Sequence, residues 1–509
     1  MNTKHSKGVI ITYVLVFGGI FLILLGGLSG FILLQLKQSN QRAGWNASLH
    51  IAEAGVNYYQ WCLNNEVEQN CLTEKDYLDS DGTPIGKFSL ETAQTVFCGE
   101  TIQRKIISTG WTNEFPQIKR KVSVSYARLS VGKYSYIIND NVWVGDDHVI
   151  RGPFHSNGGI RMDGENQSLV TSSAPDGKWI CTDSFGCGPA GMANRGIGLG
   201  HCPDICDIVD KNCVCPGVFT TTTNGNPDLF SFPVTSFDFP GITIDLARMK
   251  DLAVSGNGLY FGPSGAEGYR VVIDEDNIEV WKVLTTTMIN NICTIIGSKV
   301  ICDGGVCEPE CSECQGNKCV VKDPIIQTEE SMGSYPILQS CGLIFFEDNL
   351  WVGKENEASN VKGKITIVSA DLIDSNKKTD VWLQGNINYV RGSELDGLIV
   401  IAQRNNLIGL YSPDSMKLRG IFVAQNGFFG RNHYPCSKYS PYCLREELEI
   451  FGSIVSNGRV GTQWTSGSQV SSGYLKRESY FDPNLVYSPP PFAPYVEPDF
   501  KIVKWEEIK

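Results

Sequence analysis

The chain begins with a long apolar run that reads as one helix. From Gly8 to Leu34 there is no charged residue, and most positions are Ile, Leu, Val, Phe or Gly. As a helix this run is roughly 40 Å long, enough to cross a bilayer with some tilt. Small and apolar residues then recur at helical spacing, at Ala43, Ala47, Ile51, Ala54 and Tyr58. The pattern predicts one helix from about Gly8 to about Leu63, half in lipid and half packed on the body. A transmembrane helix followed by a separate amphipathic helix is the alternative.

A cleaved secretory signal peptide is a second alternative for the same segment. Its apolar core would be about 7–15 residues long and would end at a small-x-small cleavage site. This run is about twice that length and ends in Leu34-Gln35-Leu36-Lys37. We therefore expect the helix to remain as an anchor.

Short apolar strands punctuated by glycine dominate the body, and three of them repeat. Gly152–Ile160 matches Gly452–Val460 in its glycines and its Ser-Asn-Gly turn, and Gly420–Phe428 is a slightly longer third copy. Each copy predicts a strand, a turn with positive φ at Asn-Gly, and a second strand. Such repeats are typical of a β-solenoid, in which each coil buries its face on the next. A conventional β-sandwich with convergent hairpin turns is the alternative.

The segments on either side of these repeats contain further strands and turns. Residues Lys119–Leu129 alternate in polarity, as in a half-buried strand. The acidic run Leu78–Thr83 is either a calcium loop or a solvated turn, and the missing distant glutamate favours the turn. Near the C-terminus, Pro489–Pro491 favour a polyproline II strap over the body, with a partner-docking peptide as the alternative. A last strand is expected near Lys501–Trp505.

Composition and charge narrow the class of protein. Charged residues make up only 19% of the 509 positions, while the chain has 53 glycines and 10% aromatic residues, a mixture that favours a mainly β body with many turns. The net charge is −12, so the field repels phosphates and we expect no nucleic-acid partner. All 18 cysteines follow the apolar run. That number fits an oxidising compartment, which places the N-terminus in the cytoplasm and the body outside.

The cysteines cluster, and two interpretations compete. The two tight clusters comprise Cys202, Cys206, Cys213 and Cys215, then Cys307, Cys311, Cys314 and Cys319. Four thiolates can hold zinc, but neither cluster has two paired knuckles, so disulfides are favoured. Five cysteines lie between positions 302 and 319, so at least one of them must pair elsewhere. Cys436 and Cys443 are expected to close a small loop.

The N-terminal region resembles that of PilX-type minor pilins. The matching features are the basic leader ending in Lys7-Gly8, the stretch Val9-Ile10-Ile11, and the element Ile51–Val56 with its Ala-Glu-Ala-Gly core. His155–Arg161 and the proline-rich C-terminal end also resemble sequences of that family. The resemblance implies that a prepilin peptidase cuts after Gly8 and leaves Val9 at the N-terminus. It further implies other pilin subunits and the pilus assembly platform as partners.

One position departs from the wider superfamily. Major pilins carry glutamate at the fifth mature position, where it pairs with a neighbour's N-terminus, and this chain has Tyr13 there. A role as the repeating subunit is therefore not expected, whereas a rare tip or priming subunit is. In the element Ala52-Glu53-Ala54-Gly55, the small residues are expected to let another helix approach closely.

Catalytic motifs are not found in the sequence. The six histidines form no H-E-x-x-H pattern, and there is no G-x-S-x-G elbow or P-loop. His155 and Ser156 are neighbours on a predicted strand, so they face opposite ways and cannot act as a base and its nucleophile. The acids Asp146 and Asp147, beside His148 and Arg151, are the one constellation that suits a solenoid enzyme acting on polysaccharide, although an exposed turn is favoured.

These inferences combine into one prediction. The fold is α+β but mainly β: a long N-terminal transmembrane helix followed by a disulfide-rich β domain with a β-solenoid. The predicted segments are a leader 1–8, a helix 9–63, a helix-packed β region 64–135, a solenoid-like body 136–180 and 360–475, a cysteine-rich insertion 181–359, and a strap and strand 476–509. The predicted function is that of a non-enzymatic, single-pass, minor-pilin-like protein acting in pilus assembly, tip structure or adhesion. It needs no cofactor or metal, and its partners include membrane lipid. The alternatives are an anchored polysaccharide-acting enzyme and a type II secretion pseudopilin.

Overall fold

The computed structural model describes most of the chain and divides it into two compact units. The described residues are 7–65, 67, 71–188, 201–210, 212–240, 245–295, 311–315, 318–374, 376–466, 469–497 and 499–508. Unit 1 comprises Met1–Thr95, Gln103–Ala127 and Asp499–Lys509, and unit 2 comprises Val96–Ile102 and Arg128–Pro498.

Unit 1 contains one long helix, α1 (Lys7–Asn64). The helix is uninterrupted, so the prediction of a single helix is confirmed and that of two helices is wrong. Residues 10–43 are exposed throughout, whereas from Gly44 onwards buried positions recur along one side. The absence of proline and the helical spacing of small residues explain this continuity.

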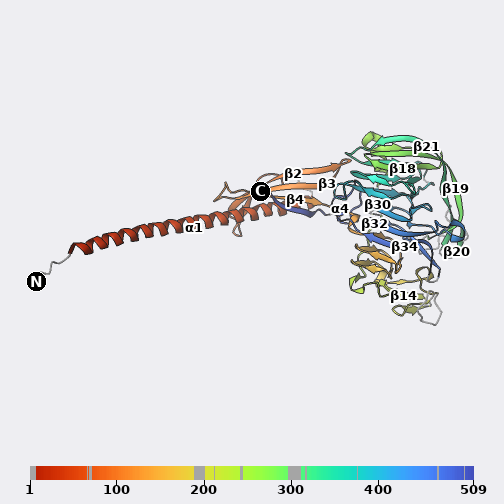
Figure 1. Ribbon diagram of the computed structural model, residues 1–509, viewed down its shortest axis with the longest axis horizontal. Coiled ribbons are helices and arrows are strands. Elements are labelled where there is room, and N and C mark those ends of the chain that lie inside the picture. Colours follow the sequence, from red (N-terminus) through yellow and green to blue (C-terminus); the bar gives the residue numbers. More distant parts are fainter. Residues whose placement is uncertain are drawn as a thin grey trace. The chain divides into compact units, whose positions relative to one another are not determined.

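A five-stranded sheet packs against the second half of α1 within unit 1 (Figure 1). Its order is β1 (Lys75–Leu78), β2 (Pro84–Phe97), β3 (Glu100–Thr112), β4 (Arg120–Ala127) and β35 (Lys501–Ile508). The predicted strands at Lys119–Leu129 and Lys501–Trp505 are β4 and β35, which pair antiparallel. Between β1 and β2, the backbone N–H groups of Asp81 and Thr83 donate to the Asp79 carboxylate, so the acidic run is a turn.

Unit 2 is built mainly from parallel strands. Its largest sheet follows the order β16 (Phe230–Ser231), β11 (Val170–Ser172), β8 (Phe154–Ser156), β5 (Tyr136–Ile138), β32 (Leu444–Ser456), β30 (Ser415–Ala424), β28 (Gly397–Ala402), β25 (Lys364–Ser369), β22 (Leu343–Phe346) and β17 (Leu259–Phe261). Every pairing along this path is parallel. The strands are buried on both faces, which explains their nearly continuous apolar sequences.

Three shorter parallel sets accompany this sheet. They are β18 (Gly268–Glu275), β23 (Leu350–Val352), β26 (Val381–Leu383), β29 (Asn406–Ile408) and β31 (Phe429–Gly430); β6 (Val142–Val144), β9 (Ile160–Met162) and β15 (Val218–Phe219); and β24 (Ser359–Val361) with β27 (Ile387–Tyr389). Apolar side chains from all of them form one core with the large sheet.

The order of the large sheet shows how the body is threaded. The chain enters at β5, stacks outward through β8 and β11 to β16, and resumes at the opposite edge with β17. From there it stacks back through β22, β25, β28 and β30 until β32 pairs with β5. The strands β5 to β16 and β17 to β32 of this path therefore form one continuous parallel stack, although the two groups are separate in sequence.

Two of the three sequence repeats lie on neighbouring strands of this stack, β30 and β32, and the third lies on β8, with β5 between β8 and β32. In the pairing of β30 with β32, Gly420 is opposite Gly452 and Ala424 is opposite Ser456. Positive φ occurs at these two glycines, each at 143°, and at none of the Asn-Gly glycines, so that prediction is wrong. The turn glycines are needed for close approach instead: a Cβ on Gly427 would lie 2.1 Å from Asn405 Oδ1.

Asparagines of two of these repeats are linked through Asn139, which follows β5. The Asn157 amide donates to Asn139 Oδ1 at 2.7 Å, and the Asn139 amide donates to Asn457 Oδ1 at 2.9 Å. The three side chains form a ladder across β8, β5 and β32. The asparagine of the Ser-Asn-Gly motif is thus explained by contacts between the ends of neighbouring strands and not by local turn strain.

Antiparallel pairs, further short strands and short helices complete unit 2. A long hairpin is formed by β19 (Asn277–Ile295) and β21 (Lys318–Pro336), with β20 (Cys311–Gln315) on β21. Further antiparallel pairs are formed by β12 (Lys178–Ile180) and β13 (Asp207–Val209) with β14 (Asn212–Pro216), and by β33 (Gln463–Ser466) with β34 (Gln469–Tyr480). β34 also pairs in parallel with β32 and with β7 (His148–Ile150), and β7 pairs in parallel with β10 (Glu165–Asn166). The helices are α2 (Leu246–Leu252), α3 (Cys436–Tyr439) and α4 (Pro483–Tyr487).

The proline-rich tail packs on unit 2 as a strap. Pro489, Pro490 and Pro491 are buried and adopt no strand, and Thr366 Oγ1 donates to the Pro491 carbonyl at 2.6 Å. The strap is preceded by helix α4, which the sequence did not predict. The Asp482 carboxylate caps that helix by accepting from the Asn484 N–H.

Candidate functional site: the exposed half of the N-terminal helix

The first half of α1 is an apolar cylinder that contacts no other described part of the chain. Eighteen-residue windows here reach a mean hydropathy of 2.4 with no burial, and the helix is long and apolar enough to cross a membrane. Large side chains such as Ile11, Leu22 and Ile23 are 64–77% exposed. The run from Ile10 to Leu36 is about 40 Å long, against roughly 30 Å of bilayer hydrocarbon. The surface therefore suits lipid or another apolar helix.

Charged and aromatic groups mark the end of this apolar half. Lys37 and Arg42 are exposed just beyond it, and Trp45 is 50% exposed one turn later. The Arg120 guanidinium stacks on the Trp45 ring at 3.3 Å and pairs with Glu507. Tryptophan with a flanking cation is the usual composition of a membrane–water boundary.

Glycines in the apolar half give it surfaces for close helix packing. A Cβ on Gly18, Gly19, Gly26, Gly27 or Gly30 would meet nothing within 4 Å. Gly19, Gly26 and Gly30 lie on one side of the helix, because spacings of seven and four residues return to nearly the same face. Gly26 and Gly30 form a small-xxx-small pair of the kind that joins transmembrane helices. Sequence reasoning missed this signal, which is legible as Gly26-Gly27-Leu28-Ser29-Gly30.

The predicted helix-contact element lies elsewhere and is occupied by the chain itself. Ala52 is fully buried, and a Cβ on Gly110 of β3 would lie 2.3 Å from the Ala52 backbone nitrogen. A Cβ on Gly55 would lie 2.3 Å from Ser108 Oγ and 2.8 Å from Phe88. The expectation that Ala52 and Gly55 leave room for another helix is therefore wrong, because their small size admits the protein's own sheet. Glu53 and Ala54 are half-buried beside them.

The other predicted helix residues occupy the free half. Tyr13 is 61% exposed, and its ring lies 6.5 Å from that of Phe17. Gly8 and Val9 belong to the helical backbone of α1. The predicted cleavage between them remains a prediction.

Disulfides join those cysteines of unit 2 whose side chains the structure describes. Bonds link Cys181 to Cys187, Cys202 to Cys213, Cys206 to Cys215, and Cys436 to Cys443. The last bond closes the predicted small loop. Cys98 pairs with Cys341, 243 residues away, and in unit 1 Cys62 pairs with Cys71. The side chains of Cys307, Cys311, Cys314 and Cys319, and so the pairing expected between 302 and 319, lie outside the described residues.

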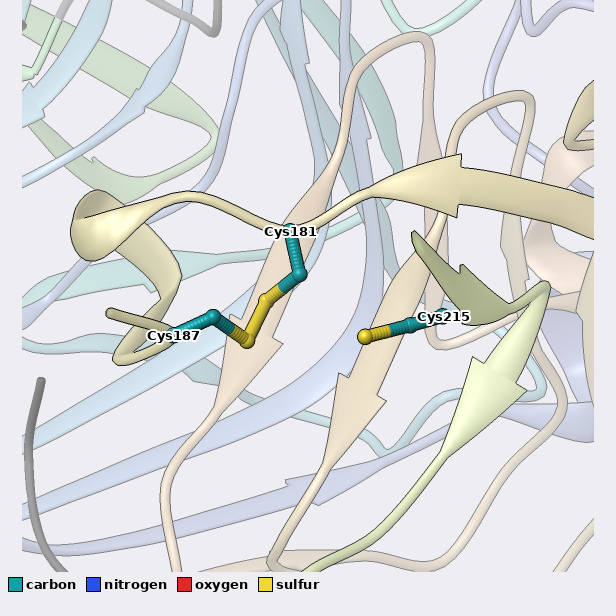
Figure 2. Close-up of side chains that lie close together, drawn as sticks. All are labelled: Cys181, Cys187 and Cys215. Atoms are coloured by element: carbon teal, nitrogen blue, oxygen red, sulfur yellow. A yellow bond between two sulfur atoms is a disulfide. The ribbon is translucent and has the colours of Figure 1, made fainter. Parts of the chain in front are cut away.

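Three sulfur atoms lie close together where Cys181 and Cys187 meet the first cysteine cluster. The sulfurs of Cys181, Cys187 and Cys215 lie within 4.8 Å of one another (Figure 2). Cys181 and Cys187 are bonded to each other, and Cys215 is bonded to Cys206. A sulfur in a disulfide carries no thiolate charge, so this group acts as a staple under the short sheet of β12, β14 and β13.

The acidic constellation considered for catalysis does not converge. Asp146 is exposed in a turn, whereas both oxygens of Asp147 accept from the Arg477 guanidinium, and Asp147 also accepts from Gln463. His148 is buried, with Nε2 2.9 Å from Ser479 Oγ, and burial beside Arg477 holds its pKa well below the usual value. Arg151 instead donates to Gln167. Both acids lie in the predicted turn, but only Asp146 is exposed there, because Asp147 is half-buried as an ion-pair partner of Arg477.

His155 is bonded within the wall of the stack. It is 2% exposed, and its ring nitrogens lie 2.8 Å from Thr171 Oγ1 and 3.0 Å from Asn157 Oδ1. The Ser156 hydroxyl donates to the Asp140 carbonyl instead, so the two side chains do not pair. Burial lowers the pKa of His155.

Comparison with known proteins finds a distant structural similarity. No protein-family model matches the chain, and no curated protein matches it. Among solved structures, the chain aligns with the crystal structure of the competence-associated pilin ComZ from Thermus thermophilus. The two are 12% identical with a TM-score of 0.28, over 91% of this chain and 97% of that one. A TM-score of this size is too low to establish a common fold.

Proposed function

We propose that the chain is a membrane-anchored, minor-pilin-like protein whose body lies outside the cytoplasm and which acts in type IV pilus assembly, tip structure or adhesion. The observation that carries the proposal is the division of α1 into two halves. Residues 10–43 are exposed and are largely apolar as far as Leu36, and the rest of the same helix is fixed to a sheet. Together with the resemblance at Lys7–Ile11 and Ile51–Val56, this supports a helix that inserts into lipid or a helical bundle and carries a folded body.

The proposed orientation is N-terminus in and body out. The six disulfides among the described cysteines support it, because disulfides persist in oxidising compartments. Exposed Trp45 and Arg42 would lie at the outer membrane–water boundary of the anchor, with the sheet of unit 1 starting just beyond. Lipid and a prepilin peptidase are the partners that this arrangement requires at the membrane.

Contact with other subunits is proposed to use the free half of the helix. The face of Gly19, Gly26 and Gly30 admits a neighbouring helix without a steric cost. Tyr13 replaces the carboxylate that docks repeating subunits, so we propose low stoichiometry, as in a tip or priming subunit. A type II secretion pseudopilin would use the same helix.

We further infer that the parallel sheets of unit 2 are coils of a β-solenoid. Continuous parallel pairing from β17 to β16, together with the ladder of Asn157, Asn139 and Asn457, supports this. The same architecture occurs in polysaccharide-acting enzymes, which is why an anchored enzyme is the second candidate. The engagement of Asp147 with Arg477 favours a non-enzymatic role, because an ion-paired carboxylate is a poor general base.

Processing of the N-terminus provides the test. In cells with an active prepilin peptidase, the membrane-extracted protein should have the intact mass of a chain beginning at Val9. The variant Gly8→Ile should retain residues 1–8 and still insert into the membrane. Deletion of the protein should reduce surface fibres or their adhesion. A wild-type protein that keeps Met1, or unchanged fibres after deletion, would contradict the proposal.

A further inference from the structure

The outward side of the large sheet is covered over one part of its length and open over another. In β30 and β32, Leu418 and Ile450 point into the main core, so the residues next to them in sequence face outward. Beyond Gly420 and Gly452, the outward residues join a second apolar cluster that covers the sheet. Before those glycines, the outward residues are exposed or half-buried. A parallel sheet is normally covered on both sides, so this open part is unusual.

Four neighbouring parallel strands contribute to the open part, namely β30, β32, β34 and β7. The first three lie side by side in Figure 1. Their registers place the outward side chains in rows that run across the strands. These side chains are called the open face, and they belong to Ser415, Lys417, Arg419, Glu447, Glu449, Phe451, Lys476, Glu478, Tyr480 and Arg151.

Two aromatic rings occupy the centre of one row of the open face. Phe451 is opposite Tyr480, and their ring centroids lie 6.4 Å apart. The Arg419 guanidinium lies 5.2 Å from the centroid of the Phe451 ring, and the Arg151 guanidinium lies 5.1 Å from that of Tyr480. With strands about 4.8 Å apart, the row of four side chains is about 14 Å long. It is therefore a flat aromatic strip with a cation at each end.

The rows beside this strip alternate in charge. The Lys417 ammonium lies 3.4 Å from the Glu449 carboxylate, and the Lys476 ammonium donates to Glu447 at 2.6 Å and lies 2.9 Å from Glu478. Most charges of the open face are thus paired within it. Its four basic and three acidic side chains leave it nearly neutral, on a chain whose net charge is −12.

This composition favours one chemical class of ligand. A hydroxyl group both donates and accepts hydrogen bonds, so it matches the cations and the carboxylates of the open face equally well. Phosphate and carboxylate groups only accept, and the acidic side chains and the net charge would repel them. Sugar rings combine many hydroxyl groups with C–H faces that pack on aromatic rings.

We propose that the open face binds a neutral polysaccharide chain, with sugar rings stacked on Phe451 and Tyr480 and their hydroxyl groups bonded to the charged rows. Such a ligand supplies the bound surface in the adhesion role proposed above, on which this inference rests. The carbohydrate is bound and not cleaved, so no covalent step is involved.

The test uses the full chain in micelles of a detergent without sugar groups. The probes are neutral cello-, malto-, manno- and galacto-oligosaccharides, with oligogalacturonate and single-stranded DNA as acidic probes. Isothermal titration calorimetry should show binding of at least one neutral probe with a dissociation constant below about 1 mM. For that probe, Phe451→Ala should weaken binding at least about tenfold, because the stacked ring is lost.

The matched control is Tyr487→Ala, which removes an exposed aromatic ring at the end of α4. It should leave the dissociation constant within about twofold. If Phe451→Ala fails to fold, Tyr480→Ala removes the neighbouring ring of the strip. Absence of binding to every neutral probe would overturn the proposal, as would binding of the acidic probes alone or equal effects of the Phe451 and Tyr487 variants. Calorimetry on purified protein does not depend on processing at Gly8, so failure here is distinguishable from failure of the pilin-like role.

Discussion

Adding one methyl group at Gly110 should separate α1 from its sheet in unit 1. The Cβ of Gly110→Ala would lie 2.3 Å from the Ala52 nitrogen and 2.5 Å from the Ser48 carbonyl oxygen, both backbone atoms that cannot rotate away. Reaching an ordinary contact requires the helix to move by about 1 Å, and a gap of that size forfeits roughly a quarter to a half of the dispersion contacts across it. Three large side chains of this interface are buried, Ile51, Val56 and Tyr59.

The cost follows from those contacts. Each such side chain contributes about 2 kcal/mol of burial, so a loss of a quarter to a half for the three amounts to about 1.5–3 kcal/mol. The assay is hydrogen exchange at the amides of residues 48–60 in the full chain in detergent, where Gly110→Ala should lower the opening free energy by that amount. Lys105→Ala, at an exposed site on the same strand, should change it by less than about 0.5 kcal/mol. Equal exchange in Gly110→Ala and wild type would refute the reasoning.

Three further predictions concern unit 2. Replacing Cys98 and Cys341 by alanine opens a loop of 243 residues. The entropy of closing that loop in the unfolded chain corresponds to about 5 kcal/mol of stability, so the urea midpoint of unit 2 should fall sharply. An unchanged midpoint would contradict this. Burial lowers the pKa of His155 in the folded protein. The contribution of His155 to the free energy of unfolding should therefore be complete above about pH 6.5 and decline below it, because the unfolded chain takes up the proton first. The decline is at most about 1.4 kcal/mol per pH unit. The same slope in His155→Gln would assign the effect elsewhere. Asp147→Asn should cost about 2 kcal/mol by leaving its guanidinium partner unpaired, whereas Asp146→Asn should be neutral in the same denaturation assay; equal effects would contradict the assigned contacts.

Features that depend on local spacing could be predicted from the sequence. The helix was predictable to within a residue or two because its apolar run and the small residues from Ala43 to Tyr58 share one period and no proline interrupts them. The small loop closed by Cys436 and Cys443 was predictable because few residues separate the two cysteines. The strand β4 was recognisable from its alternation, although the prediction that it is half-buried is wrong, because nearly all its positions are buried.

Features that depend on distant pairing could not be predicted. Nothing in the sequence near β35 indicates that it pairs with β4, and nothing near Cys98 identifies Cys341 as its partner. The long strands β19 and β21 lie within the predicted cysteine-rich insertion. The cysteines there drew attention away from the strand patterns of the residues before and after them. Register and partner are set by tertiary contacts, which a single sequence does not reveal.

Two wrong predictions about small residues have the same cause. Glycine in Ser-Asn-Gly suggested positive φ, and small residues at Ala52 and Gly55 suggested a second helix. In both places the small residue leaves room for another part of this chain. That part is Asn405 at Gly427 and strand β3 at Ala52. A small residue in a sequence indicates close approach, but not what approaches.

Thiol labelling in intact cells tests the central claim that α1 anchors a disulfide-bonded body outside the cytoplasm. A membrane-impermeant maleimide is applied to whole cells with and without prior treatment by an impermeant reductant, and the labelled protein is counted by mass. The account predicts labelling of intact cells after reduction and almost none without it. Ready labelling without reductant would contradict the disulfide-bonded body, and labelling only after lysis would place that body on the cytoplasmic side.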